Sequence, residues 1–429
     1  MQKLEELVED YSRHAVPDEK TVSGIRIGFI LAGVTITVPA FLVGIEVGQG
    51  LGLYQTILAA FSGGFVLFLI GGLTGTIAAR THLSTYVILQ FAFGVQGAKL
   101  VSFVIALTSL GWFAVTCVLF ASAVYTSILG TFAIDVSQQF YLVGGSVLMV
   151  LTTIFGFKAL DKVSIIIVPL LAVFLAVVAW YSVKSNSFNV VLDYAGNGMS
   201  FGRAVSAIIG GYIVGMTLLP DLCRYAKQKY DGVVGALLGS FISYPLVLVL
   251  SALPSIATAS TDYIGLLIAL GLGTGGIMML ILATWTTNAN NLYSSSLALS
   301  TIFTDLKKWK IVILIGVVGT VLAASGIAEN LIGFLIVLGF LVPPVAGIYI
   351  TDYYFVDKDA YHLQSQETSI KVNPDAFIAW FAGSVVGYCS TKGLITVSGV
   401  SSIDAIIVAS IAYRIFSGFR NKTKKTDSA

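Results

Sequence analysis

The chain has 429 residues, of which 56% are hydrophobic and only 11% are charged, whereas soluble domains carry about 25% charged residues. A soluble fold of this size could not bury so much apolar surface, and the three cysteines and three histidines are too scattered to form a metal motif. The net charge of +2 gives no reason to expect a nucleic-acid partner. The composition therefore predicts an all-α polytopic membrane protein whose main partner is the lipid bilayer.

Continuous apolar runs divide the chain into membrane-spanning helices. The stretches 100–134, 232–261 and 263–304 contain no Asp, Glu, Lys or Arg, and each exceeds the roughly 20 residues that cross a hydrocarbon core. A transmembrane barrel would instead show alternating segments of about 10 residues. We predict one transmembrane domain over 1–429 with twelve helices, at about 25–46, 55–78, 99–127, 139–157, 163–183, 203–220, 232–256, 272–301, 311–326, 330–351, 375–391 and 402–418.

The distribution of basic residues predicts the orientation of the chain. With the N-terminus in the cytoplasm, every Lys and Arg except Lys184, Arg203 and Lys392 lies in or beside a cytoplasmic segment. Cytoplasmic loops of membrane proteins are enriched in Lys and Arg in this way. A miscount of one span would invert every later loop, so the pattern favours twelve spans. We expect a bacterial inner-membrane protein with both termini in the cytoplasm.

Two of the predicted spans contain residues that interrupt helices. Pro39 lies inside the first span and cannot donate an N–H to the carbonyl of Thr35. The sixth span contains Gly210, Gly211 and Gly215. Interrupted helices at corresponding places in two halves of a chain point to the central site of a transporter. Ordinary kinks with close helix packing are the alternative, because Gly211 and Gly215 also form a GxxxG motif.

The third and eighth spans carry side chains suited to binding. Trp112 offers a flat face to a planar ligand, although core packing is the commoner role of a buried Trp. In the eighth span, Thr286 and Thr287 offer hard oxygen ligands for a sodium ion. The asparagines beside them are costly in a membrane without partners, so they favour a site, with interhelical hydrogen bonding as the alternative.

Charged residues are missing from the middle of every predicted span, and Glu46 and Asp221 fall at span ends. A charged substrate would need a buried counter-charge, and a proton relay would need a buried acid. We therefore expect a neutral polar substrate with sodium as the coupling ion. Nothing resembles the repeated filter of a channel or the nucleophile and base of an enzyme. The prediction is a secondary transporter and not an enzyme.

Several short motifs together resemble those of the nucleobase–cation symporter family of cytosine, purine, uracil and hydantoin permeases, and the bacterial cytosine permeases most closely. The resemblance extends over the first ten spans. It is carried by Gly33-Val34-Thr35, Gly48-Gln49-Gly50-Leu51, Thr85-Tyr86, Phe91-Ala92-Phe93-Gly94-Val95, Gly111-Trp112-Phe113, Gly156-Phe157-Lys158, Asp221, Arg224-Tyr225, Trp285-Thr286-Thr287-Asn288 and Asn291-Leu292-Tyr293.

The resemblance implies a leucine-transporter-type fold. Two inverted repeats of five helices would cover about 25–183 and 203–351, followed by two extra helices within about 375–418. It also implies a sodium site and no other cofactor. Its ligands would be the carbonyls of Val34, Thr37 and Ala283 with the hydroxyls of Thr286 and Thr287.

The substrate residues follow from the same resemblance. A planar ring would stack on Trp112 and Tyr212, and its contacts would come from Ser109, Val38, the backbone at Val214 and Gly215, Asn288 and Asn291. Cytosine permeases carry glutamine at Ser109, serine at Val214 and phenylalanine at Tyr212, and lack Pro39. We expect a sodium-coupled symporter, acting as a monomer, that imports cytosine or a related pyrimidine or purine. The alternative substrates are a thiamine-precursor hydroxymethylpyrimidine, a hydantoin or another small heteroaromatic molecule.

Overall fold

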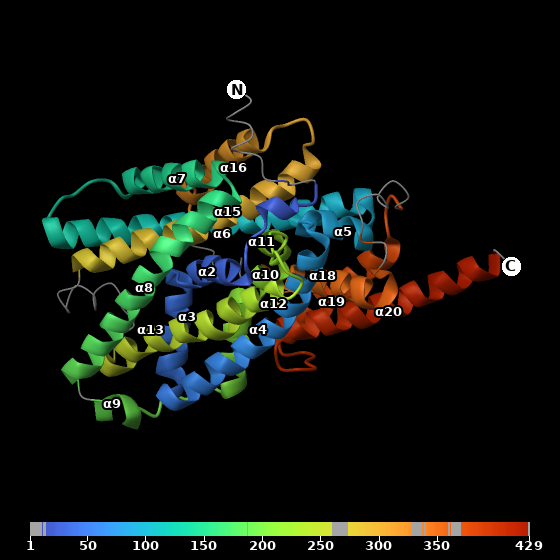
Figure 1. Cartoon of the computed structure of the whole chain (residues 1–429). Coiled ribbons are helices and arrows are strands. Elements are labelled where there is room, and N and C mark those ends of the chain that lie inside the picture. Colours follow the sequence, from blue (N-terminus) through green and yellow to red (C-terminus); the bar gives the residue numbers. More distant parts are fainter. Residues whose placement is uncertain are drawn as a thin grey trace.

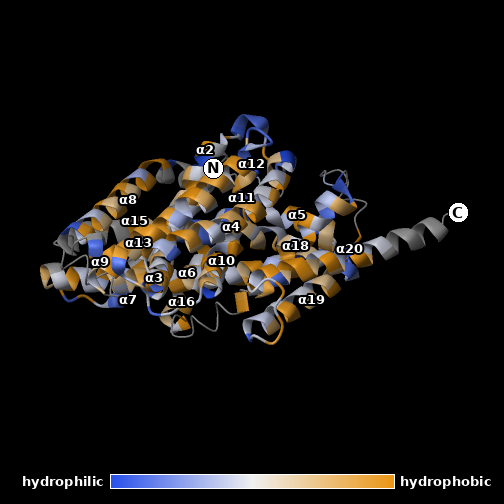
Figure 2. Ribbon diagram, turned by 90° about the horizontal axis from the view of Figure 1, so that it is seen from below, coloured by the Kyte–Doolittle hydropathy of each residue, from blue (hydrophilic) through white to orange (hydrophobic). Residues whose placement is uncertain are grey.

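The computed structural model of the chain describes residues 11, 14–186, 188–259, 273–327, 337, 338, 340–358, 361 and 370–427. Within these ranges the regular elements are helices, and one isolated β-bridge joins Val22 to Ala226 (Figure 1). Figure 2 shows hydrophobic residues along the helices and hydrophilic residues gathered mostly at their ends and in the loops. This distribution agrees with the all-α membrane fold expected from the composition.

The helices follow the predicted spans closely. Their bounds are α2 Gly24–Thr35, α3 Val38–Leu51, α4 Leu53–Thr81, α5 Thr85–Phe93, α6 Val95–Phe132, α7 Gln138–Ile154, α8 Phe157–Asn186, α9 Phe188–Asp193, α10 Phe201–Thr217, α11 Pro220–Cys223, α12 Asp231–Ala236, α13 Tyr244–Thr258, α15 Gly273–Ile302, α16 Lys308–Ala324, α18 Pro343–Thr351, α19 Pro374–Thr391 and α20 Ser401–Asp427. A π-helical stretch, Leu237–Ser243, joins α12 to α13. The tenth predicted span, 330–351, lies partly outside the described residues.

By length and apolar composition, five helices of the described part can cross a membrane, and a sixth span results if α2 and α3 count as one. The predicted number of twelve and the inverted symmetry of two repeats therefore stay predictions. Short helices such as α7 and α10 are apolar but have only 17 residues each, which is at the lower limit for crossing the hydrocarbon core.

The helices pack in two groups. One group consists of α6, α7, α15 and α16, whose buried side chains, including Phe113, Phe120, Met149 and Leu292, form a core of their own. The other contains α2, α3, α4, α10, α12 and α13, which belong to a larger core that extends to the last helices. The first, second, sixth and seventh predicted spans thus lie together, and the third, fourth, eighth and ninth form the opposing group.

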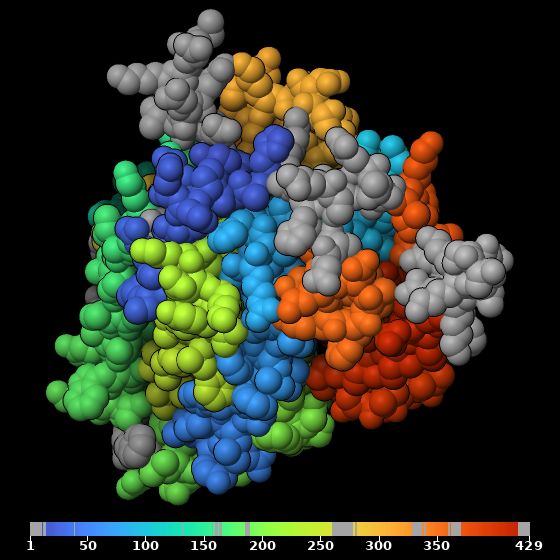
Figure 3. Space-filling model, turned by 45° about the vertical axis from the view of Figure 1, so that its right-hand side comes forward, coloured from blue at the N-terminus to red at the C-terminus, as the bar shows by residue number. Residues whose placement is uncertain are grey.

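Close approach within the larger group depends on glycines of α3. A Cβ atom added at Gly44 would lie 2.1 Å from the Ser251 hydroxyl, and one added at Gly48 would lie 2.6 Å from the Ala252 methyl. Both partners belong to α13, so these glycines let α3 and α13 pack backbone to backbone. The pair α19 and α20 packs side by side at one end of the molecule (Figures 1 and 3). Asp352 fixes α20 there by accepting a hydrogen bond from Tyr413 at 2.6 Å.

Candidate functional site

The first predicted span is broken where Pro39 predicts a break. α2 ends at Thr35 and α3 begins at Val38, with 68° between the two axes. Thr37 adopts an extended conformation and its hydroxyl caps α3 by accepting the Ala40 N–H at 3.3 Å. Because Pro39 has no N–H, the helical ladder cannot continue across the break. Backbone oxygens at the end of α2 therefore face the neighbouring helices.

A cavity of about 550 Å³ lies beside this break, between the two groups of helices. From the larger group, α2, α3, α10 and Tyr244 line it, and from the smaller group α6 and α15 line it. The predicted site residues that line it are Val34, Thr37, Ser109, Trp112, Tyr212, Val214, Gly215, Thr287 and Asn291. The side chain of Val38 lies outside the described residues. The sequence thus identified residues from four helices that the fold brings to one cavity.

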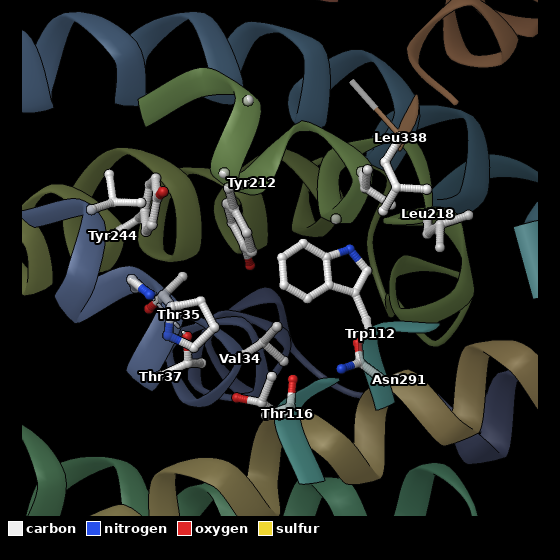
Figure 4. A pocket seen from close by; sticks show the side chains of 18 of the residues that line it. Val34, Thr35, Thr37, Trp112, Thr116, Tyr212, Leu218, Tyr244, Asn291 and Leu338 are labelled. Atoms are coloured by element: carbon white, nitrogen blue, oxygen red, sulfur yellow. Dashed lines mark hydrogen bonds between the residues drawn. The ribbon is translucent and has the colours of Figure 1, made fainter. Parts of the chain in front are cut away.

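Two aromatic side chains from different helices line the cavity. Tyr212 from α10 stands opposite the indole of Trp112 from α6, and its hydroxyl points into the space toward the indole (Figure 4). Behind it, Tyr212 packs on Tyr244 with ring centroids 5.0 Å apart and an angle of 32° between the rings. The packing holds Tyr212 in place, so the cavity offers a flat ring two fixed aromatic side chains on which to stack.

Hydroxyl and carbonyl oxygens converge where α15 crosses the break. The Thr286 hydroxyl lies 3.1 Å from the Gly33 carbonyl oxygen and 2.9 Å from that of Ala283. The Thr287 hydroxyl lies 3.1 Å from the same Ala283 oxygen. Uncharged oxygens at the end of a broken helix suit a hard monovalent cation. The sequence did not single out Gly33, whose carbonyl position depends on where the helix bends.

The chain matches, over residues 15–408, the family described as permeases for cytosine/purines, uracil, thiamine and allantoin. It belongs to this family of permeases. It is 27% identical over 424 residues to the cytosine permease of Escherichia coli (strain K12), covering 98% of this chain and 96% of that protein. It is 25% identical to the hydantoin permease of Microbacterium maritypicum, over 79% of this chain and 74% of that protein.

The fold of this permease is that of a solved nucleobase-cation-symport-1 transporter. The structure of Mhp1 in a closed conformation with bromovinylhydantoin bound superposes with a TM-score of 0.85. The similarity covers 97% of this chain and 96% of that one, at 20% sequence identity. These comparisons confirm the family resemblance and place the chain among permeases, which are not enzymes.

The structure does not bring Asn288 of the permease to the cavity. Asn288 is fully buried, and its amide lies 3.1 Å from the Phe113 carbonyl and 3.2 Å from the Cys117 sulfur, both on α6. It also accepts a hydrogen bond from Asn291 at 3.2 Å. Asn288 therefore joins α15 to α6 and orients Asn291, while Asn290 lines the cavity instead. The two positions differ by about 200° around the helix.

The interruption that we expected at the glycines of the sixth span does not occur. α10 continues through Gly210, Gly211 and Gly215 and ends at Thr217. The carbonyl of Val214 accepts the Leu218 N–H at 3.0 Å, so it is not the free backbone group that we expected. No proline interrupts this stretch, and a helix tolerates glycines at a modest cost. The glycines instead form a wall without side chains where α10 meets the cavity.

Acidic residues lie closer to the site than the sequence suggests. Glu46, an exposed residue near the end of α3, lines the cavity, and it is the one charged side chain among the described lining residues. Asp221 is buried, and its Oδ1 accepts the Thr85 N–H at 2.9 Å, whereas its Oδ2 has no hydrogen-bond partner in the described part. Burial raises the pKa of Asp221 to about 6, against the lowering effect of the nearby Arg224. Asp221 is not among the cavity residues of the described part.

Three buried polar atoms of the cavity have no hydrogen-bond partner among the described residues. They are the Tyr212 hydroxyl, the Thr116 hydroxyl and the Asn290 carbonyl oxygen. Buried polar groups in native proteins nearly always have partners, so each exception needs an explanation. Thr116 lies one helical turn from Trp112, on the same face of α6, which is the signal by which the sequence could have identified it.

We expect the substitution Tyr212→Phe to separate stability from binding. It removes a buried hydroxyl without a partner, so the melting temperature should stay the same or rise. Affinity for a substrate with polar ring substituents should fall about five- to tenfold, because one hydrogen bond is lost. Thermal unfolding and ligand titration of both proteins measure the two effects. A variant that binds as tightly as the parent would show that the hydroxyl does not contact the substrate.

Proposed function

We propose that this permease is a sodium-coupled symporter that imports a nucleobase-like heteroaromatic molecule by alternating access. The observation that carries the proposal is the aromatic pair Trp112 and Tyr212, which flanks a cavity beside a broken helix. A flat ring gains stacking energy on an aromatic side chain, and the cavity offers two of them. Movement of the two helix groups against each other would expose the cavity to each side of the membrane in turn.

Sodium coupling is supported by the oxygens around Thr286. Its hydroxyl already connects α15 with the end of α2 through Gly33. A sodium ion bound among Thr286, Thr287 and the carbonyls of Gly33, Val34, Thr37 and Ala283 would tie the two helix groups together at the same place. Ordering the break in this way would shape the adjoining wall of the substrate cavity, so ion and substrate would favour each other's binding.

The substrate class is supported by the polar atoms between the aromatic walls. Thr116, Tyr212 and Asn290 offer donors and acceptors that suit the ring nitrogens and carbonyls of a nucleobase. Relatives named as cytosine and hydantoin permeases act on such rings. Cytosine or a related base is our first candidate. A thiamine-precursor pyrimidine or a hydantoin is the alternative, with the same mechanism. We further propose a monomer in the bacterial inner membrane with both termini cytoplasmic.

The function is tested by binding to the purified permease. A panel of cytosine, uracil, adenine, hydroxymethylpyrimidine and a hydantoin is titrated in sodium chloride and in choline chloride. We expect at least one of these rings to bind in sodium and to bind more weakly in choline. An amino acid and a sugar serve as controls that should not bind. If the folded protein binds none of the rings, the proposed substrate class is wrong.

The residues that distinguish this permease from cytosine permeases predict its specificity. Ser109 and Val214 both line the cavity and offer fewer side-chain hydrogen bonds than glutamine and serine. We expect weak selectivity for cytosine in the parent, and tighter cytosine binding in the double variant Ser109→Gln, Val214→Ser, by about tenfold. Competition among cytosine, uracil, adenine and hydroxymethylpyrimidine measures it. A parent that already prefers cytosine strongly would contradict the prediction and direct attention to Asn290 and Asn291.

A further inference from the structure

The cavity continues past the aromatic pair, between α3 and α10. These helices run antiparallel. A Cβ atom added at Gly211 of α10 would lie 3.8 Å from the Val43 side chain of α3. Later along α3 but earlier toward α10, the Met199 N–H donates to the Gly50 carbonyl at 3.1 Å. Between these two contacts, Glu46 of α3 lies beside Ala207 of α10 in the pairing of the two helices. At a rise of 1.5 Å per residue, Ala207 lies about 7 Å from Tyr212 along the helix axis.

We call this end of the cavity the distal compartment and define it by Leu42, Glu46, Ala207, Gly210 and Ser401. It is the open end of the cavity, because Leu42, Glu46 and Gly210 are exposed and a Cβ added at Gly210 would meet no atom within 4 Å. The small side chain of Ala207 continues the same wall one turn earlier. The distal compartment is therefore space that a bare ring held at Trp112 would leave unfilled.

A fixed loop bounds the distal compartment. The Ser206 hydroxyl donates to the Gly399 carbonyl at 2.9 Å, which ties α10 to the loop before α20. That loop is folded around the buried carboxylate of Asp404, which accepts hydrogen bonds from Ser390 at 2.7 Å and from the Ser398 hydroxyl at 2.6 Å. Ser401 follows this loop directly, so its position at the edge of the cavity is set by the fold.

Glu46 gives the distal compartment its chemical character. It is the one charged side chain among the described residues that line the cavity, and within the described part no hydrogen bond or ion pair engages its carboxylate. Its neighbours along the same face of α3, Leu42 and Val43, are apolar. Glu46 itself is exposed at this open end of the cavity, where its carboxylate can accept hydrogen bonds from an ammonium group, which donates up to three.

We propose that the distal compartment receives an amine-bearing substituent of the transported ring, whose ammonium group donates hydrogen bonds to Glu46. This inference rests on the proposed function, because it assumes that the ring is held between Trp112 and Tyr212. The cavity of about 550 Å³ is of the size that holds ligands larger than one ring. The expected substrate is thus a heteroaromatic ring with a short aminoalkyl chain and one positive charge.

The test compares matched rings that differ only by the amine. Thymine and 5-aminomethyluracil form one pair, and 5-methylcytosine and 5-aminomethylcytosine form the other. Binding is measured on the purified permease at saturating sodium, for the parent and for Glu46→Gln. We expect the parent to prefer the aminomethyl compound of a pair by about tenfold or more, and Glu46→Gln to lose most of that preference. Asp193→Asn, which removes an exposed carboxylate elsewhere, should keep it.

A second pair of variants tests whether the substituent needs the open volume of the distal compartment. Gly210→Leu places a side chain in the distal compartment, whereas Gly202→Leu places one on the same helix outside the cavity, where an added Cβ also meets no atom within 4 Å. We expect Gly210→Leu to weaken binding of 5-aminomethyluracil relative to uracil by at least fivefold. The reason is that the added leucine would overpack the distal compartment where the aminomethyl group is expected to lie. Gly202→Leu should leave the ratio unchanged. Thermal unfolding of each variant confirms that the comparison is between folded proteins.

The outcomes separate the inference from the proposed function. A parent that binds rings without preferring the amine overturns the inference alone, as does an equal preference in Glu46→Gln. If Glu46→Gln weakens every ring by the same factor, Glu46 does not recognise the amine and the inference is also overturned. A folded parent that binds none of the rings overturns the proposed function and, with it, this inference.

Discussion

Replacing Trp112 by alanine is expected to abolish substrate binding while leaving the protein folded. Stacking of a base on an aromatic ring contributes about 1–3 kcal/mol, and the indole forms one whole wall of the cavity. The affinity should therefore fall by about fivefold to more than a hundredfold. Binding of a labelled ring to the purified variant measures the loss.

Two further variants test whether the effect of Trp112→Ala comes from loss of the stacking face in the cavity. Trp180→Ala removes an indole that is 69% exposed on α8 and far in sequence from the cavity helices, and it should bind as the parent does. Trp112→Phe keeps a smaller stacking face and should restore part of the affinity. If Trp112→Ala binds substrate normally, Trp112 is a packing residue and the aromatic pair is not the substrate site.

Replacing Thr286 by alanine is expected to weaken sodium binding and substrate uptake together. The hydroxyl is the one side-chain atom that links α15 to the Gly33 carbonyl at the end of α2 among the described hydrogen bonds. Loss of one oxygen ligand should raise the sodium concentration for half-maximal uptake by about tenfold or more. Uptake into proteoliposomes at a series of sodium concentrations measures the shift.

The controls for Thr286→Ala lie on the same helix. Thr286→Ser keeps the hydroxyl and should stay close to the parent. The Thr301 hydroxyl donates to the carbonyl three residues earlier at 2.7 Å, as the Thr286 hydroxyl does. Thr301 lies at the end of α15 that is away from the break, so Thr301→Ala should leave the sodium dependence unchanged. Equal sodium dependence in Thr286→Ala and the parent would contradict the sodium site.

The sequence predicted those features that depend on local chemistry. Pro39 lacks an N–H, and the break beside it follows from that property alone. The apolar runs predicted where helices form because a membrane-spanning backbone must satisfy its own hydrogen bonds. Trp112 was singled out by its flat face and Tyr212 by family resemblance, and the fold places both on one cavity.

Features that depend on the rotation of a helix or on three-dimensional packing could not be predicted from the sequence. Asn288 and Asn290 are alike in composition, and the orientation of α15 against Phe113 and Met149 decides that one is buried and the other lines the cavity. Glu46 falls at the end of an apolar run. Only the antiparallel packing of α3 on α10 shows that a span-end residue of this kind reaches the cavity.

The measurement that tests sodium-coupled transport most directly is the reciprocal effect of sodium and substrate on each other's affinity. Substrate is titrated at low and high sodium, and sodium is titrated without and with substrate, on the same purified protein. Two ligands coupled through one protein must change each other's affinity by the same factor. We predict that each ligand tightens the other by an equal factor of about five or more. Substrate affinity that is unchanged by sodium, together with uptake that follows a proton gradient, would contradict the account.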